Sequence, residues 1–347
     1  MAKITTSLFG GSHLGAVGVR ITGLPKGLEV DFKAIDRLLE RRRARKAAWS
    51  TPRLEGDEYT FLSGVENGFT TGEEIVAEIR NLNTRSADYP RFVPRPSHAD
   101  YAAFIKDGKI EPGGGRFSGR LTAPLCVAGG LAEGILKKRG IEVLSYVKEI
   151  NGIKGKGYPE VTRDEIVNAE NTPPYAVTNG DEMLKAMEEA RRLGDSVGGS
   201  VESVITGLPA GVGDFYTAGI ESAIAYEVFG VPAVKAVEFG LGSGFSKGYG
   251  SELNDPFRFE GGKVVTLTNN SGGINGGISN GMPITFRATL RPTPSIAKPE
   301  LSVDLSSGEN VILELKGRHD ACIVPRAAAA VEAAAAIAIL KLIMEEL

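Results

Sequence analysis

Two segments of the chain share one pattern of apolar and polar positions. "ITGLPKGLEVDFKAIDRLLERR" begins at residue 21, and "ITGLPAGVGDFYTAGIESAIAYEVF" begins at residue 205. In each, a short apolar stretch runs into a Gly-Leu-Pro turn, and apolar residues then recur at helical spacing. The pattern predicts a strand, a turn and an amphipathic helix in both places, and it indicates that the chain is internally duplicated.

A second repeated pair combines a Gly-Arg turn with a long run of small residues. "GRFSGRLTAPLCVAGGLAEGIL" begins at residue 115, and "GRHDACIVPRAAAAVEAAAAIAIL" begins at residue 317. Alanine and glycine on every face predict helices that are enclosed by protein and packed closely against their neighbours. Alternating segments such as "GKVVTLTN", "MPITFRATL" and "NVILELKG" predict strands of antiparallel sheet.

Together these elements predict an α+β fold. We expect an internally duplicated β-α-β sandwich, with central helices packed between two mainly antiparallel sheets. The 347 residues could form one large domain or two of ordinary size. Because insertions of unequal length, notably residues 150 to 195, interrupt the repeat, we expect a single domain, 1–347, with halves of about 1–195 and 196–347.

Composition narrows the class of protein. Hydrophobic residues make up 42% of the chain, and the formal net charge is only -3, so we expect no nucleic-acid partner and only local anion sites. The N-terminus lacks the layout of a signal peptide, and we expect no membrane partner because no apolar run reaches spanning length. Cys126 and Cys322 stand in apolar surroundings, which indicates buried thiols and a cytoplasmic location.

Arginines recur where their guanidinium groups could be aimed into a pocket. The run "ERRRARKAAWSTPR", taken alone, is typical of a solvated helix end. A ligand with several phosphates or carboxylates would need such residues, because arginine binds these groups in a planar, bidentate way. Other arginines stand in or beside glycine, proline or serine turns: Arg95, Arg116, Arg120, Arg318 and Arg326.

The glycine-rich stretch "TNNSGGINGGISNG", residues 268 to 281, would let backbone amides approach a planar or anionic ligand closely. Its spacing matches neither the dinucleotide fingerprint nor the P-loop, and a tight surface hairpin is an equally good interpretation. The following "LRPTPSIAKP" places Arg291, Thr293 and Ser295 within five residues, where they could cradle one phosphate.

The chain has three histidines, in "FGGSHLG" (His13), "RPSHAD" (His98) and "KGRHDAC" (His319). Each alone would be read as structural, but His98 lies between Arg95 and Asp100. Histidines near fixed charges have a reason to be tuned as proton donors or acceptors near neutral pH. The sequence has no G-x-S-x-G elbow, which disfavours a serine hydrolase, and no H-E-x-x-H or C-x-x-C pair, so we expect no metal site.

The order of these motifs resembles the chorismate synthase family over nearly the whole chain. The chain departs from the family pattern at four positions: Gly11 and Leu121 replace Glu, and Leu14 and Ser97 replace Gly. None of these changes removes a candidate catalytic group. The resemblance rests on "FGGSHLG", "GLPKG", "RRR", "SGVENGFTTGEEI", "RPSHAD", "GGGRFSGRLTA", "VESVITGLPAG", "GSELND", "TNNSGGINGGISNGMPI" and "GRHDAC".

The resemblance implies a lyase that converts 5-enolpyruvylshikimate-3-phosphate to chorismate and phosphate by 1,4-anti elimination, the last common step of the shikimate pathway to aromatic amino acids. It implies reduced FMN (FMNH2) as the cofactor, NADP in members that reduce their own flavin, and a homotetramer. The substrate has a phosphate and two carboxylates, and FMN adds another phosphate. Such a ligand set would explain many arginines in a nearly neutral protein.

The resemblance also implies residue roles. His13 is similar to the histidine that protonates the departing phosphate, and His98 to the one that favours the reactive protonation state of the flavin. Asp320 is similar to the aspartate that relays a proton with the flavin N5, which takes the substrate's C6 hydrogen. His319 takes no role. The implied substrate clamp is Ser12, Arg43, Arg53, Ser118, Arg120 and Arg318, and the implied flavin contacts are Arg95, Ser118, Asn254, Asn270, Gly273, Arg291 and Ser295.

Two functions of other classes stay open at this point. A non-catalytic relative could bind a phosphorylated metabolite or flavin as a sensor, but the presence of His13, His98 and Asp320 favours an enzyme. A nucleic-acid-binding module that used Arg41 to Lys46 would carry more basic charge than a net of -3.

Overall fold

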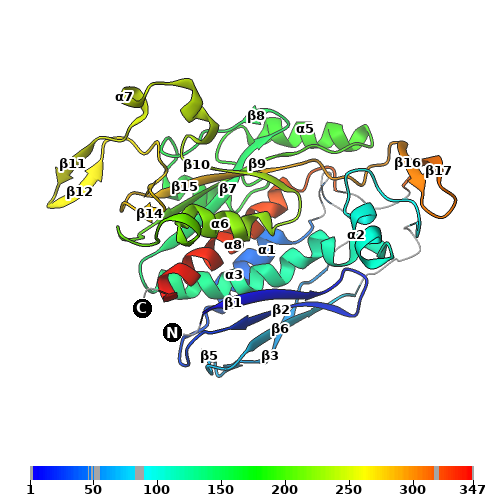
Figure 1. Ribbon diagram of the computed structural model, residues 1–347, viewed down its shortest axis with the longest axis horizontal. Coiled ribbons are helices and arrows are strands. Elements are labelled where there is room, and N and C mark those ends of the chain that lie inside the picture. Colours follow the sequence, from blue (N-terminus) through cyan, green and yellow to red (C-terminus); the bar gives the residue numbers. More distant parts are fainter. Residues whose placement is uncertain are drawn as a thin grey trace.

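The computed structural model describes residues 3–45, 47, 50, 55–82, 90–315 and 320–345, and it places a layer of helices between two antiparallel sheets (Figure 1). The first sheet has the order β1-β2-β6-β3, with β1 Thr5–Gly10, β2 Ala16–Thr22, β6 Ile75–Arg80 and β3 Tyr59–Ser63. The second has the order β10-β15-β9-β7-β8, with β10 Val234–Phe239, β15 Ile284–Leu290, β9 Gly199–Thr206, β7 Glu142–Ile150 and β8 Ile153–Lys154.

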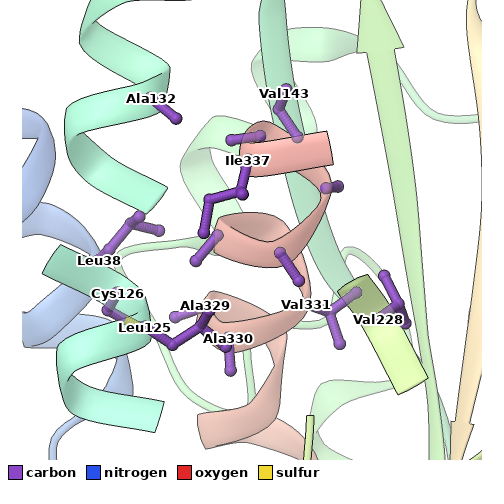
Figure 2. Close-up of a cluster of buried hydrophobic side chains, with 14 of the residues drawn as sticks. Leu38, Leu125, Cys126, Ala132, Val143, Val228, Ala329, Ala330, Val331 and Ile337 are labelled. Carbon is purple, nitrogen blue, oxygen red and sulfur yellow. The ribbon is translucent and has the colours of Figure 1, made fainter. Parts of the chain in front are cut away.

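Four helices fill the space between the sheets and confirm the predicted sandwich. Figure 2 shows α8 at the centre of the buried cluster, with α3 on one side and Val228 of α6 on the other. Leu38 projects into the same cluster from α1, and Val143 projects into it from β7. The helices are α1 Phe32–Arg42, α3 Thr122–Lys137, α6 Ile220–Phe229 and α8 Val324–Glu345.

Glycines in α3 let the helices touch along their backbones. A Cβ at Gly129 would lie 2.2 Å from the Cβ of Ala333, and one at Gly130 would lie 2.5 Å from the Cα of Ile35. Real side chains do not come this close, so α3 can approach α8 and α1 only with glycine at these positions. The prediction that helices of small residues pack closely is confirmed.

The two sheets repeat one order of strands. Strands β1, β2, β6 and β3 correspond to β7, β9, β15 and β10, which are also neighbours in that order. In both halves a helix follows the second strand in the chain, α1 after β2 and α6 after β9, and a long helix ends the half. On this correspondence β7 belongs with the second half. We propose that the halves divide between α3 and β7, near residue 140, rather than near residue 195.

The remaining elements lie around this sandwich. "MPITFRATL" forms β15 in the second sheet, whereas the predicted strands in "GKVVTLTN" and "NVILELKG" pair only within separate hairpins. Figure 1 shows the β11–β12 hairpin projecting from the body. The hairpins are β4 Val65–Glu66 with β5 Phe69–Thr70, β11 Phe257–Glu260 with β12 Lys263–Thr266, β13 Ile274–Asn275 with β14 Ile278–Ser279, and β16 Glu300–Asp304 with β17 Glu309–Leu313; the outer helices are α2 Asp100–Asp107, α4 Arg163–Ala169, α5 Gly180–Arg192 and α7 Gly250–Leu253.

Helix α8 corrects the expectation that no apolar run reaches spanning length. Val324–Met344 is 21 residues long and apolar enough to cross a membrane by length and composition, but 83% of its most apolar window is buried inside the protein. The alanines that make it apolar pack against α3 and α6 (Figure 2). Its composition is therefore that of a core helix enclosed on all sides.

The basic run at the end of α1 is also not the solvated helix end that its composition suggests. Asp31 caps the helix by accepting hydrogen bonds from the backbone amides of Lys33 and Ala34. At the other end Arg41 is 3% exposed and donates to both carboxylate oxygens of Glu332 at 2.9 Å. Arg42 is 4% exposed and lines the cleft described below.

Candidate active site

A cleft of about 250 Å³ opens where α1 ends and where α3 and α8 begin. Its wall combines segments that are far apart in the sequence: the turn after β1, the loops before α2 and α3, the loop after β15, and the first turn of α8. The polar lining includes His13, His98, Asp320 and the arginines Arg42, Arg95, Arg120, Arg291 and Arg326. The cleft thus gathers guanidinium groups and titratable side chains in one place.

A glycine loop holds the two histidines apart. Gly113 and Gly114 have φ values of 63° and 84°, which favour glycine. A Cβ at Gly113 would lie 2.0 Å from His13 Cε1, and a Cβ at Gly114 would lie 2.9 Å from His98 Cε1. The loop therefore packs against both imidazoles, and only glycine leaves room for the two rings.

His13 is held through its Nδ1 atom. The buried Ser12 hydroxyl lies 3.1 Å from that nitrogen and donates its one proton to the carbonyl oxygen of Gly113 at 3.2 Å. The hydroxyl must then accept a hydrogen bond from Nδ1–H of His13. In this tautomer Nε2 is the ring nitrogen that is not bonded to Ser12, and His13 lines the cleft.

His98 sits in a second buried network. Its Nδ1 lies 2.6 Å from Asp100 Oδ1, and Arg95 donates to both oxygens of the same carboxylate, at 2.7 Å from Nε and 2.9 Å from Nη2. Burial lowers the pKa of His98, the hydrogen bond to Asp100 opposes that shift, and the charge of Arg95 adds to it. Burial opposes ionisation of Asp100, but its bonds to Arg95 and His98 outweigh that effect and lower its pKa. In the free protein the pKa of His98 therefore lies below that of an ordinary histidine, and its Nδ1 lies against a carboxylate.

Two further arginines line the cleft on the side of α3. Arg42 donates to Asp57 Oδ2 at 2.8 Å and to the carbonyl oxygen of Gly119 at 3.1 Å. Arg120 pairs with Asp57 Oδ1 and donates to Asn81 Oδ1 at 2.9 Å. The two buried guanidiniums therefore share one carboxylate.

Asp320 lines the cleft just before α8. Arg326 Nη1 approaches both of its oxygens, at 3.1 Å and 3.0 Å, and Arg326 Nε donates to the carbonyl oxygen of Arg42 at 3.0 Å. The Thr293 hydroxyl donates to the Asp320 backbone oxygen at 2.9 Å. These contacts fix the carboxylate of Asp320 at the edge of the cleft.

Arg291 differs from the other cleft arginines. Its guanidinium donates to the carbonyl oxygen of Pro292 at 3.1 Å, and within the described part of the chain it makes no ion pair with a carboxylate. Its charge acts on His98, so the two side chains are near each other. A cation that lacks a carboxylate partner in a cleft is suited to bind an anionic ligand. Over the ranges that the structure describes, no group of three His, Cys, Asp or Glu side chains is arranged to hold a metal ion.

Comparison with known proteins decides the family. The sequence profile described as chorismate synthase matches residues 4–344. The chorismate synthase of Thermococcus kodakarensis is 46% identical over 342 residues, covering 97% of this chain and 94% of that protein. The chorismate synthase of Aeropyrum pernix is 44% identical over 345 residues, covering 97% and 90%. The chain belongs to the chorismate synthase family.

The fold agrees with this membership. A solved structure described as "Crystal Structure of Chorismate Synthase" superposes with a TM-score of 0.77 at 24% sequence identity, covering 100% of this chain and 93% of that one. The resemblance of the motifs to the chorismate synthase family is thereby confirmed, as is the predicted α+β fold.

The cleft brings together most of the residues that the family motifs implied. Three predicted catalytic residues line it, and Ser12 lies behind it against His13. Ser118 lines it beside Arg120, and Ser295 accepts a hydrogen bond from Arg95 at 3.1 Å. The predicted residues that line the cleft are His13, His98, Asp320, Ser118, Arg120, Arg95, Arg291 and Ser295.

Besides Ser12, four predicted residues are not among the described residues that line this cleft. Arg43, the residue that caps the C-terminal end of α1, pairs with Glu40 at 3.1 Å. Asn270 donates to the backbone oxygen of Leu253 at 3.0 Å, and the backbone of Asn254 caps the short helix α7. Gly273 is buried with φ 81° against Pro283. The predictions for Arg53, Arg318 and His319 lie outside the described residues.

The family motifs assigned no role to three residues that the structure places at the site, Arg42, Asp57 and Arg326, although Arg326 was among the arginines expected to reach a pocket. Helical spacing could have identified Arg42, because it follows Ile35, Leu38 and Leu39 on the buried face of α1. Arg326 stands in the first turn of α8, six residues after Asp320, but its pairing with that carboxylate is visible only in the fold. No local pattern marks Asp57.

Proposed function

We propose that this chain converts 5-enolpyruvylshikimate-3-phosphate to chorismate and phosphate by 1,4-anti elimination, with reduced FMN as its cofactor. The observation that supports the proposal best is the convergence of His13, His98 and Asp320 on one cleft that five arginines line. The family supports a chorismate-forming enzyme. The substrate, the cofactor and the residue roles below belong to the proposal.

The donor set fits these ligands. The substrate and FMN together carry several phosphate and carboxylate groups, and arginine binds such groups with paired hydrogen bonds. Arg291, which has no carboxylate partner in the described ranges, and Ser295 would hold an anionic group near His98. Arg42 and Arg120 would hold another on the side of α3.

Reduced FMN, when bound, would supply an electron-rich ring that accepts the substrate's C6 hydrogen. His13 would donate a proton from Nε2 to the phosphate as its carbon-oxygen bond breaks, while Ser12 holds Nδ1. His98, oriented by Asp100, would hold a proton beside the flavin. Asp320, oriented by Arg326, would accept the proton that leaves the ring. General acid and base groups of this kind typically contribute about 100- to 10,000-fold to a rate.

Anaerobic turnover tests the proposal directly. Photoreduced FMN and 5-enolpyruvylshikimate-3-phosphate are mixed with the protein, and chorismate is followed by its absorbance. We expect chorismate and phosphate in equal amounts, with no turnover when oxidised FMN replaces the reduced form. Tight binding of both ligands without product would instead favour a sensor.

The glycine loop gives a test of how His13 is placed. Gly113→Ala is expected to lower turnover by roughly 100-fold, because the new Cβ would push the imidazole from its position and a displacement of about 1 Å can have this effect. Gly108→Ala is a matched control, since Gly108 also has a positive φ, of 73°, but a Cβ there would meet no described atom within 4 Å. The positive φ alone should cost each variant about 1 kcal/mol of stability, and the contact with His13 adds to the loss in Gly113→Ala. Equal turnover in the two variants would contradict the assigned position of His13.

The proposal also includes a cytoplasmic homotetramer, and NADPH, which becomes NADP, as the source of electrons for the flavin. Apolar side chains on the projecting hairpin support self-association, since Phe257 is 66% exposed and Phe259 is 83% exposed. A monomer in analytical ultracentrifugation at micromolar concentration would contradict the tetramer. Anaerobic flavin reduction by NADPH would test the electron source.

A further inference from the structure

A carboxylate that no motif singles out lies directly behind two arginines of the cleft. The side chain of Asp57 is 0% exposed. Its Oδ2 accepts a hydrogen bond from Arg42 Nη1 at 2.8 Å, and its Oδ1 contacts Arg120 Nη1. Both guanidiniums line the cleft, whereas Asp57 is not among the described lining residues. Asp57 is therefore placed to act on a ligand only through the two arginines.

Most other contacts of these arginines are with neutral groups that fix the planes of the guanidiniums. Arg42 donates to the Thr122 hydroxyl and the Gly119 carbonyl, and Arg120 donates to the Asn81 side chain and the Arg80 carbonyl. In the described part of the chain Glu55, which also lines the cleft, forms an ion pair with only one of these two arginines, Arg120, at 3.5 Å. Within the described ranges, Asp57 is the carboxylate that contacts both guanidiniums.

Two buried cations side by side repel each other unless a charge of opposite sign lies between them. Burial alone would raise the pKa of Asp57, but Arg42 and Arg120 outweigh burial and hold the pKa below its usual range. Asp57 therefore remains ionised near neutral pH, and its charge lies between the two guanidiniums and reduces their repulsion.

We propose that Asp57 is the positioning residue of this cleft, and that its carboxylate holds Arg42 and Arg120 side by side as a receptor for one oxyanion group of the substrate. Two guanidiniums fixed at one carboxylate present their remaining N–H groups in a set geometry, which reduces the ordering that a ligand must bring about. The identity of the oxyanion as a substrate group rests on the proposed function.

The backbone makes asparagine the informative replacement. Asp57 has φ 52°, a left-handed conformation that Asp and Asn adopt more readily than other side chains. Asp57→Asn therefore keeps the backbone and the shape of the side chain and removes its charge. An amide can still accept from one arginine, but its NH2 group faces the other, so the pair should separate.

The test measures the binding of inorganic phosphate by calorimetry at fixed ionic strength, together with steady-state kinetics. Asp57→Asn is expected to weaken phosphate binding at least tenfold. It should raise KM for 5-enolpyruvylshikimate-3-phosphate by a similar factor, with kcat lowered less than threefold. Glu202→Gln is the matched control, because Glu202 is a buried carboxylate that accepts from the Tyr146 hydroxyl on the second sheet. The phosphate affinity of Glu202→Gln should equal that of the parent protein.

Several results would overturn the proposal. Unchanged or tighter phosphate binding by folded Asp57→Asn would mean that the carboxylate is inert or competes with the ligand. An equal loss of phosphate affinity in Asp57→Asn and Glu202→Gln would mean that removing any buried charge weakens phosphate binding. If the parent protein did not bind phosphate, Arg42 and Arg120 would not form an oxyanion receptor. Phosphate binding that depends on Asp57, in a protein that makes no chorismate, would support the positioning role and contradict the proposed function.

A double variant tests the proposal if Asp57→Asn alone does not fold. The double variant Arg120→Gln/Asp57→Asn removes one charge of each sign, and its phosphate affinity is compared with that of Arg120→Gln alone. Because Asp57 would act through its arginines, adding Asp57→Asn to a chain that lacks Arg120 should change phosphate affinity less than threefold. A tenfold change in that background would overturn the proposal.

Discussion

Replacing Asp320 with asparagine is expected to lower turnover by roughly 100- to 10,000-fold, the range over which general acid and base groups act. The amide keeps the shape of the side chain but cannot take up a proton. In the structure the carboxylate is fixed by Arg326 at 3.0 Å and lines the same cleft as both histidines. Single-turnover formation of chorismate with reduced FMN measures the effect.

The kinetic constants separate a base from a residue that only holds Arg326. Loss of a base should appear in kcat, whereas release of Arg326 should appear mainly in KM for the anionic substrate. Asp195→Asn is a suitable control, since it neutralises a carboxylate paired with Lys298 at 2.7 Å that is not among the described lining residues. A turnover number of Asp320→Asn close to that of the control would refute the assigned role.

Much of the fold could be predicted because its signals are local. The Gly-Leu-Pro turn and the helical spacing after it recur at residues 21 and 205, and each segment forms the end of a strand and then a helix. The enclosed helices α3 and α8 were visible in their alanines and glycines. The pairing partners of the strands were not, since β15 joins β9 and β10 while β12 and β17 remain in separate hairpins.

The proposed division of the repeat near residue 140 also depends on strand pairing that the sequence does not reveal. Strand β7 lies before the long insertion, so sequence spacing alone assigns it to the first half. In the sheet it takes the position that β1 has in the other sheet, next to the second strand of the repeat. Strand order is a property of the folded chain, and insertions of unequal length conceal it in the sequence.

The residues of the site also differ in how far the sequence could predict them. The family motifs favoured Arg43, but Arg43 is not among the described lining residues and pairs with Glu40. Arg42 instead shares the buried face of α1 with Ile35 and Leu38. The phase of the helix therefore decides which arginine can reach a ligand. Asp57 could not be predicted from any pattern, because its role follows from contact with two residues that are distant in the sequence.

Replacing each catalytic histidine is expected to give two separable defects. His13→Ala should slow the departure of phosphate by roughly 100- to 10,000-fold and leave the absorbance spectrum of bound flavin unchanged. His98→Ala should change that spectrum as well as the rate, because His98 is placed to hold a proton beside the flavin. Single-turnover rates and bound-flavin spectra of both variants, recorded between roughly pH 6 and 9, test the separation.

The lowered pKa of His98 predicts how the stability of the free protein changes with pH. In the free protein burial lowers its pKa below the ordinary value of about 6.5, so the unfolded chain binds this proton more readily than the folded one. The free protein should therefore lose stability as pH falls below about 6.5, and His98→Ala should lose less. Bound phosphate and carboxylate groups would raise the pKa of His98 again, so the turnover of the parent should fall as pH rises past this raised pKa. If His98→Ala kept the parent's flavin spectrum, pH profile and acid sensitivity, His98 would have only a structural role.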